Sequence, residues 1–181
     1  MSLIVPANVV CHLTNQCNKS PLFVDTRDYY EFLNKFRKYV LPYCDVLAWC
    51  LVPDQYHFLL VVNQKGAEVH QLGGIRISNF GNGVRLLQSK YAQNVNLRDD
   101  SSGNLFKQKA KLRCCDLSPS QHIDVIFKCI HTIPYELGYT EDLKFWPFSS
   151  YPDYFGYRGG TLINRPLAQT CLGSEYETFA F

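Results

Sequence analysis

The middle of the sequence contains two apolar runs that are separated by a short polar hinge. Residues 44–51 and 56–62 are rich in aliphatic, aromatic and β-branched side chains, and a Pro-Asp turn lies between them. This arrangement predicts two adjacent antiparallel strands. Because alternate residues of a strand face the same side of its sheet, Gln55 and His57 should lie side by side on one face. The pattern therefore places one polar pair in an otherwise apolar hairpin.

Apolar positions spaced three to four residues apart predict three helices. The first begins at Asp25 and Thr26, which cap it, and ends before Pro42. The second lies within residues 70–94, where several glycines weaken the pattern. The third is expected over residues 118–134, because it opens on a Ser-Pro pair with capping-box spacing and reaches a proline at its end.

Two further strands complete the predicted sheet. Residues 8–15 alternate between apolar and polar side chains, and residues 105–115 do so with lysines at positions 107, 109 and 111 on one face and Arg113 in phase. The resulting order, β-α-β-β-α-β-α, matches an α+β ferredoxin-like fold, an antiparallel sheet with helices packed on it. We expect this domain to cover residues 1–155 and to be followed by a C-terminal tail or extension over residues 156–181.

The composition is that of a chain that can bury a core of its own. It has 181 residues, of which 46% are hydrophobic and 14% aromatic. No apolar run reaches the roughly 20 residues that span a bilayer, and the start MSLIVPANVV lacks the features of a signal peptide. These observations predict a soluble protein of the cytoplasm. The eight cysteines contain no CxxC pair, so buried reduced thiols are favoured over disulfides or a zinc site.

A net charge of only +2 conceals a strongly basic middle segment. Residues 64–115 carry nine lysines and arginines but only three acidic residues. Such a cluster is typical of proteins that bind a polyanion, most often nucleic acid. The alternative is a solvated helix face and turn without a partner.

Five blocks of sequence carry a resemblance to a known family: VCHLTNQCNKSPLFVDTRDYYEFL, LAWCLVPDQYHFLLVV, SKYAQNVN, GNLFKQKAK and FKCIHTIPYELGYTEDLKFWPFSSY. In the same order and spacing, they resemble the REP-associated and insertion-sequence single-tyrosine transposases of the HUH endonuclease superfamily. The resemblance extends over about residues 8–155 and implies a nuclease that binds single-stranded or hairpin DNA. It also implies a divalent metal, Mg²⁺ or Mn²⁺, and a helix-borne tyrosine that attacks a backbone phosphate.

Three of the four catalytic positions that the resemblance implies are substituted in this chain. The paired metal-ligating histidines fall on Gln55 and His57, the tyrosine on Cys129, and the asparagine that is the usual third ligand on Ile133. Gln55 can still offer an oxygen to a hard ion, whereas Ile133 offers no ligand. A cysteine near the end of a helix has no evident source of thiolate activation, so Cys129 is expected to be inactive.

The resemblance and the basic segment together predict a transposase-family DNA-binding protein with impaired catalysis and a weakly held or absent metal. One alternative is an active, metal-dependent strand-transferase with a rebuilt site, and another is a non-catalytic module that binds a protein partner. The resemblance leaves open whether the chain forms a homodimer. The residues predicted to contact DNA phosphates are Arg85, Lys90, Lys107, Lys109, Lys111 and Arg113.

Overall fold

A computed structural model describes residues 4–19, 21–115 and 123–173. Its elements are, in chain order, β1 (Val10–Gln16), α1 (Thr26–Tyr39), the 3-10 turn η1 (Leu41–Tyr43), β2 (Cys44–Val52), β3 (Gln55–Val62), α2 (Gln64–Ala67), β4 (Val69–Leu72), β5 (Ile75–Ser78), α3 (Asn79–Arg98), β6 (Lys111–Cys115), α4 (Ile123–Glu136), the 3-10 turn η2 (Leu143–Phe145), α5 (Tyr151–Tyr154) and α6 (Arg165–Leu172). None of these helices is long and apolar enough to cross a membrane.

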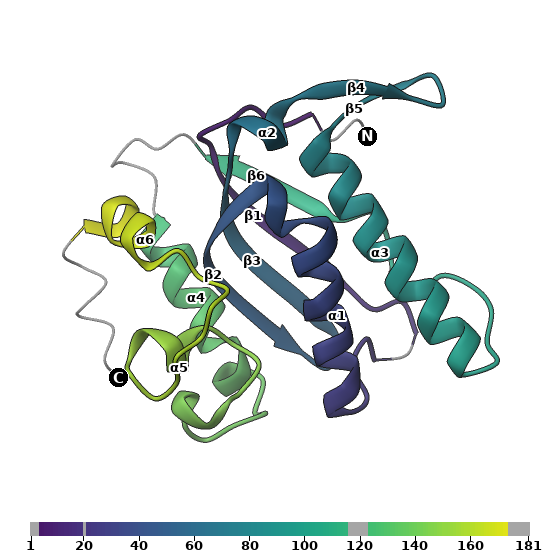
Figure 1. Cartoon of the computed structure of the whole chain (residues 1–181). Coiled ribbons are helices and arrows are strands. Elements are labelled where there is room, and N and C mark those ends of the chain that lie inside the picture. The colour runs from purple at the N-terminus through teal and green to yellow at the C-terminus, as the bar shows by residue number, and fades with distance from the viewer. Residues whose placement is uncertain (1–3, 20, 116–122, 174–181) are drawn as a thin grey trace.

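The main sheet is antiparallel throughout, with the strand order β2-β3-β1-β6. The elements β1, α1, β2, β3, α3 and β6 follow the order of a ferredoxin-like domain. Helices α1 and α3 lie side by side over one face of the sheet, and α4 and α6 pack on the other (Figure 1). The predicted α+β fold class is therefore confirmed, with α4 as an added helix.

Strand β3 shows how the alternation of side chains builds a core on both faces of the sheet. Tyr56 and Phe58 are fully buried in the cluster beneath α1 and α3. Leu59 points to the other face, where it joins a second cluster that contains Phe127 of α4. His57 shares the face of Leu59, so this histidine lies at the margin of the second cluster.

The second predicted helix has different bounds in the structure. Residues 69–78 form the β4–β5 hairpin, whose turn is made by Gly73 and Gly74 in left-handed conformations, and α3 begins only at Asn79. The glycines at 81 and 83 do not interrupt α3. Gly83 lies against α1 so closely that a Cβ atom there would overlap the carbonyl oxygen of Tyr39. Gly83 therefore permits close helix packing, which the sequence pattern alone does not reveal.

The predictions for the last strand and the third helix also need correction. Strand β6 begins at Lys111 rather than near residue 105, since the preceding segment bends after an isolated bridge between Cys17 and Phe106. Helix α4 continues through Pro134 to Glu136, because the proline removes a single backbone hydrogen bond and the residues that follow it still extend the helix. The predicted start at Ser118 lies outside the described residues.

Cys11 and Cys114 form a disulfide between directly paired positions of β1 and β6. For this pair the prediction of reduced thiols is wrong, because the strand register brings together two residues that are 103 positions apart. Cys44 and Cys50, in contrast, are buried free thiols, as expected. Burial raises the pKa of both thiols well above its usual range, so they are inert.

Residues beyond position 155 also pack on the sheet. The backbone N–H of Asn164 donates to the carbonyl of Val46 in β2 at 2.8 Å, and Ile163 forms an isolated parallel bridge with the same residue. Helix α6 then buries Ala168 and Leu172 in the second core cluster. This segment helps to close the sheet face that α4 covers.

Candidate functional site

One face of the main sheet carries polar side chains from three neighbouring strands. Gln55 and His57 of β3 lie on this face, as predicted, and the register pairs His57 with Thr14 of β1. His12 lies two residues before Thr14 and is itself paired with Arg113 of β6. Cross-strand partners have their Cβ atoms roughly 5 Å apart, so these side chains are close neighbours. We call His12, Gln55, His57, Lys111 and Arg113 the sheet-face cluster.

The two histidines of this cluster contact each other directly. His12 Nε2 lies 3.1 Å from His57 Nδ1, and the two rings lie edge to edge with centroids 5.3 Å apart and an interplanar angle of 21°. His12 is not among the site residues predicted from the sequence. A signal was nevertheless present, because residues 12, 14 and 16 are the polar half of an alternating strand and occupy the face opposite to Cys11 and Leu13.

Both imidazoles are neutral near pH 7. Burial, with a smaller contribution from His12, lowers the pKa of His57 to about 3. Burial and the nearby Arg113 guanidinium also lower the pKa of His12 from its ordinary value. Nε2 of His57 is buried and has no hydrogen-bond partner in the described part of the chain. A neutral ring with an unpartnered nitrogen is the state in which histidine binds a metal.

The sheet-face cluster fits a divalent ion only in part. The residues that could hold such an ion are His57, through Nε2, and Gln55, through its side-chain carbonyl. Among the described residues, no three His, Cys, Asp or Glu side chains lie together as a metal-binding group. The positive charges of Lys111 and Arg113 on the same face also oppose a cation. The unpartnered Nε2 of His57 therefore favours metal binding, whereas the small number of further ligands and the nearby positive charges limit the affinity for a metal.

The structure does not bring Cys129 to the sheet face. In α4 the residues Phe127 and Ile130 point into the second core cluster, and a helix turns about 200° between positions 127 and 129. Cys129 is accordingly exposed. It lines a different cavity, of about 670 Å³, between α4 and the segment around η2. That cavity is also lined by Lys128, Thr132, Tyr135, Glu136, Glu141, Asp142, Leu143 and Tyr151.

Two other positions of α4 belong to the packing of the protein. Ile133 is partly buried and packs against the second core cluster, in keeping with its inability to bind a metal. His131 is 3% exposed, and its Nε2 lies 2.7 Å from the hydroxyl of Ser150. His131 therefore belongs to the packing between α4 and the segment around Ser150.

The six residues predicted to contact DNA fall into separate groups. Arg85 of α3 and Lys107 and Lys109 of the following segment line one groove of about 400 Å³. Lys111 and Arg113 are exposed on β6 and belong to the sheet-face cluster. Lys90 is exposed on α3, where it donates to the side chain of Gln93 at 3.2 Å. Lys107 and Lys109 therefore do not share a strand face with Lys111, since β6 begins only at residue 111.

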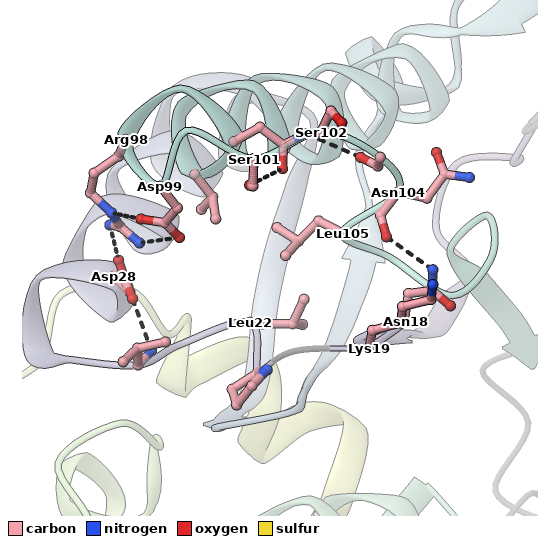
Figure 2. Close-up of a pocket in the computed structure, with 15 residues that line it drawn as sticks. Asn18, Lys19, Leu22, Asp28, Arg98, Asp99, Ser101, Ser102, Asn104 and Leu105 are labelled. Carbon is pink, nitrogen blue, oxygen red and sulfur yellow. Dashed lines mark hydrogen bonds and ion pairs between the residues drawn. The ribbon is translucent and has the colours of Figure 1, made fainter.

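A polar cavity lies directly beside this basic groove. It has a volume of about 320 Å³ and shares Gly103, Asn104 and Leu105 with the groove. Figure 2 shows its two ends, with Arg98 and Asp28 at one and Asn18 and Lys19 at the other. The segment of residues 103–105 thus separates two neighbouring hollows.

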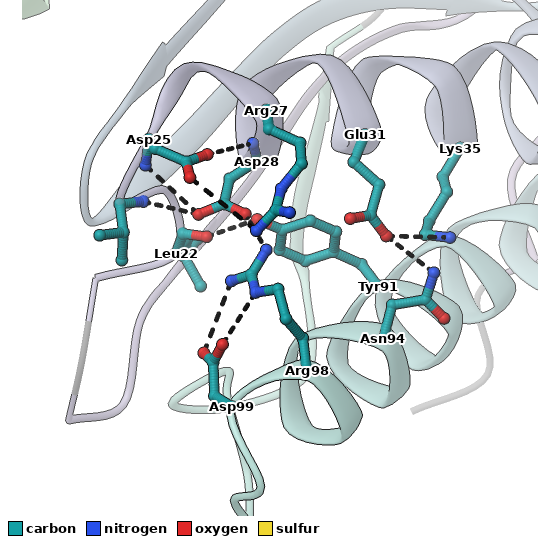
Figure 3. Close-up of polar contacts among 11 residues, drawn as sticks. Leu22, Asp25, Arg27, Asp28, Glu31, Lys35, Tyr91, Asn94, Arg98 and Asp99 are labelled. Carbon is teal, nitrogen blue, oxygen red and sulfur yellow. Dashed lines mark hydrogen bonds and ion pairs between the residues drawn. The ribbon is translucent and has the colours of Figure 1, made fainter.

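An ion pair joins the two helices that bound this polar cavity. Asp28 at the start of α1 is 1% exposed and pairs with Arg98 at the end of α3 (Figure 3). A second oxygen of Asp28 accepts from the backbone N–H of Val24 at 2.8 Å. Arg98 also pairs with Asp99 at 2.8 Å. The ion pair fixes the ends of α1 and α3 relative to each other and so supports the cavity wall.

The chain is similar in its fold to a protein of known structure. No protein-family model matches the sequence, and no curated protein is significantly similar to it. A solved structure of a REP-associated tyrosine transposase bound to a REP hairpin matches with a TM-score of 0.65 and 13% sequence identity. The match covers 88% of this chain and 85% of that protein. The chain therefore has the fold of this transposase.

Proposed function

We propose that the protein binds single-stranded or hairpin DNA and acts in the cytoplasm as a transposase-family DNA-binding protein. The observation that carries the proposal is the likeness, over 88% of the chain, to a transposase whose structure contains a DNA hairpin. The basic segment gives an independent reason, since lysine and arginine side chains neutralise DNA phosphates. The two observations concern different properties of the chain, its backbone and its charge.

Two exposed surfaces supply the positive charge for this binding. The groove with Arg85, Lys107 and Lys109 offers three cations between the middle of α3 and residues 103–109. The sheet-face cluster adds Lys111 and Arg113 from the next strand in the chain. Contacts of this kind position a nucleic-acid backbone without reading its sequence. We therefore expect affinity for many DNA sequences, with specificity arising from the shape of a hairpin.

Strand cleavage in this protein is proposed to be impaired. Cys129 replaces the tyrosine of the family and is directed away from His57, and Ile133 offers no metal ligand. A divalent ion would be held by His57 and Gln55, where it would polarise a phosphoryl oxygen as a Lewis acid. Its affinity should be low because these side chains supply only two donors. The proposal is thus a DNA-binding protein whose catalytic chemistry is reduced or lost.

An active strand-transferase with a rebuilt site is the second candidate function. It is favoured by one observation, the buried and unpartnered Nε2 of His57 in a neutral ring. This candidate predicts metal-dependent cleavage that is lost in His57→Ala. A module that binds only a protein partner would instead show no affinity for DNA at low salt.

Two labelled DNA strands, one with a hairpin and one without structure, would test the proposal. Each is incubated with the protein, with EDTA or with Mg²⁺ or Mn²⁺, and analysed on native and denaturing gels. We expect a shift on the native gel that weakens with salt, and no cleaved or protein-linked strand on the denaturing gel. Cleavage that requires metal would favour the second candidate, and no shift at any salt concentration would overturn DNA binding.

A pair of double variants makes this test specific for the groove. Lys107→Gln with Lys109→Gln removes two groove cations, whereas Lys38→Gln with Lys65→Gln removes the same charge from exposed positions on α1 and α2. We expect weaker DNA binding only in the groove variant. Equal weakening in both would indicate that net charge alone, and not the groove, determines affinity.

A further inference from the structure

The contact between His12 and His57 restricts where their protons lie. The two nitrogens, His12 Nε2 and His57 Nδ1, are 3.1 Å apart, which is a hydrogen-bond distance. A neutral imidazole has one N–H donor and one acceptor nitrogen. One of the two facing nitrogens must therefore carry the proton and the other must accept it, so only two arrangements of the pair are compatible with this contact.

The two arrangements differ at the far nitrogen of His57. If His57 donates from Nδ1, its Nε2 is a bare lone pair, whereas if His12 donates, Nε2 of His57 carries a proton. That nitrogen is buried and has no partner among the described residues. Buried N–H groups without an acceptor are rarer in native proteins than acceptors without a donor. The first arrangement is therefore the favoured one.

We infer that His12 is a positioning residue that accepts the Nδ1–H of His57 and so keeps Nε2 of His57 as a metal-binding lone pair. Metal-ligating histidines usually donate their other N–H to a partner that fixes both the tautomer and the ring orientation. A carboxylate or a backbone carbonyl often has this role, and here a second imidazole from the neighbouring strand would have it. The edge-to-edge arrangement of the two rings, with planes 21° from parallel, also holds the orientation of His57.

This inference deepens the proposed function, because it names the atom that would bind the metal and the residue that prepares it. The role of the metal rests on the proposed function, but the tautomer of His57 does not depend on DNA binding. The tautomer and the DNA binding can therefore be refuted separately. Gln55 would be the second donor, since it lies two residues before His57 on the same face.

Nitrogen-detected NMR of the histidine rings tests the tautomer directly. In the wild-type protein we expect His57 to carry its proton on Nδ1 and to have an unprotonated Nε2. The variant His12→Leu removes the acceptor and should release His57 from this tautomer. The variant His12→Gln places a carbonyl oxygen at a similar reach and should preserve it. Urea unfolding of both variants checks that the fold is retained, and His12→Gln keeps the test valid if His12→Leu does not fold.

Zn²⁺ serves as the probe for metal binding, because it accepts both nitrogen and oxygen donors. Calorimetric titration should show Zn²⁺ binding to the wild type and to His12→Gln, with affinity about 10- to 100-fold lower for His12→Leu. An Nε2–H tautomer in the wild type, a tautomer that is unchanged in His12→Leu, or Zn²⁺ binding that is absent from the wild type or equal in all three proteins would each overturn the inference.

DNA binding in EDTA separates this inference from the proposed function. We expect the wild type to shift the hairpin strand in EDTA, where the site can hold no metal, because phosphate contacts come from lysine and arginine side chains. A protein that shows the tautomer and the Zn²⁺ effect but binds no DNA would refute the proposed function alone. A protein that binds DNA but fails the tautomer test would refute the inference alone.

Discussion

His131 is a buried histidine whose protonation opposes folding. Its ring is surrounded by Phe127, Tyr151 and Tyr154, and its polar contacts include the hydroxyl of Ser150 and the backbone of Phe127. Burial lowers the pKa of His131 from its ordinary value of 6.5 to about 3. The unfolded chain therefore takes up a proton at this residue at a higher pH than the folded protein does. Stability should consequently fall as the pH decreases from about 6.5 towards 3.

The contribution of His131 can be isolated by substitution. Each proton taken up only by the unfolded chain changes the free energy of unfolding by about 1.4 kcal/mol per pH unit. We expect urea unfolding of the wild type between pH 6 and pH 4 to lose stability more steeply than that of His131→Gln, by about this amount. Parallel pH profiles for the two proteins would show that the ring is already protonated in the folded state.

Some residues of the sheet-face cluster could be predicted from the sequence and others could not. Gln55 and His57 could be placed on one face because a strand alternates with a period of two. His12 could not be linked to them, since the register between β1 and β3 joins positions that are far apart in the sequence. Cys129 was predicted to hold the position of the catalytic tyrosine only from the resemblance to the transposase family. The direction of its side chain depends on which face of α4 packs on the sheet. Local periodicity thus predicts which face of a strand a side chain occupies, whereas contacts between strands become known only from the fold.

Helices α1 and α3 are held together by a close approach of their backbones at Gly83. A Cβ atom at this position would overlap the carbonyl oxygen of Tyr39, which is backbone and cannot move aside independently. Gly83→Ala should therefore destabilise the protein by about 1–3 kcal/mol through overpacking. The improved helix propensity of alanine, worth about 1 kcal/mol, opposes this effect and makes the sign of the result informative. A urea midpoint at or above that of the wild type would contradict the close approach.

The start of α1 depends on Asp28 in two ways. Its side chain accepts from the backbone N–H of Val24, and it forms the ion pair with Arg98. Removing one partner of a buried ion pair typically costs about 3–5 kcal/mol. Because Arg98 retains Asp99 as a partner, we expect Asp28→Ala to lose about 2–3 kcal/mol in urea unfolding, below that range.

Asp99→Ala is the matched control for this prediction. Asp99 is exposed and pairs with the same arginine, so its removal should change stability little. Equal losses in the two variants would mean that the helix-capping contacts of Asp28 contribute nothing beyond the surface ion pair.

Helices and strands of this fold could be predicted where a sequence pattern was local. The cap at Asp25 and the apolar face of α1 were both predicted, and the structure shows a capping box formed with Asp28. The prediction for α3 was less accurate because glycines usually signal a break. At position 83 the glycine instead allows a tertiary contact that leaves no periodic pattern in the sequence. The start predicted for β6 at residue 105 was similarly wrong, because the alternation of polar and apolar side chains extends over a segment before Lys111 that bends.

The arrangement of charge over the whole molecule determines how DNA binding should respond to salt. A net charge of +2 would suggest weak interaction with a polyanion, but the fold gathers cations from α3, from residues 107–109 and from β6. Each phosphate contact releases condensed counterions, so the logarithm of the binding constant falls linearly with the logarithm of the salt concentration. The slope therefore counts the contacts more directly than the affinity does.

The groove variant should change this slope by a definite amount. Loss of the two contacts from Lys107 and Lys109 should reduce its magnitude by about 1.8 for a duplex hairpin stem, or about 1.4 for a single strand. The charge-matched variant at Lys38 and Lys65 should leave the slope unchanged, although its net charge is the same. Fluorescence anisotropy titrations from low to physiological salt would measure both. A groove variant with lower affinity but an unaltered slope would mean that these lysines do not contact phosphates, and DNA would then have to bind elsewhere on the surface.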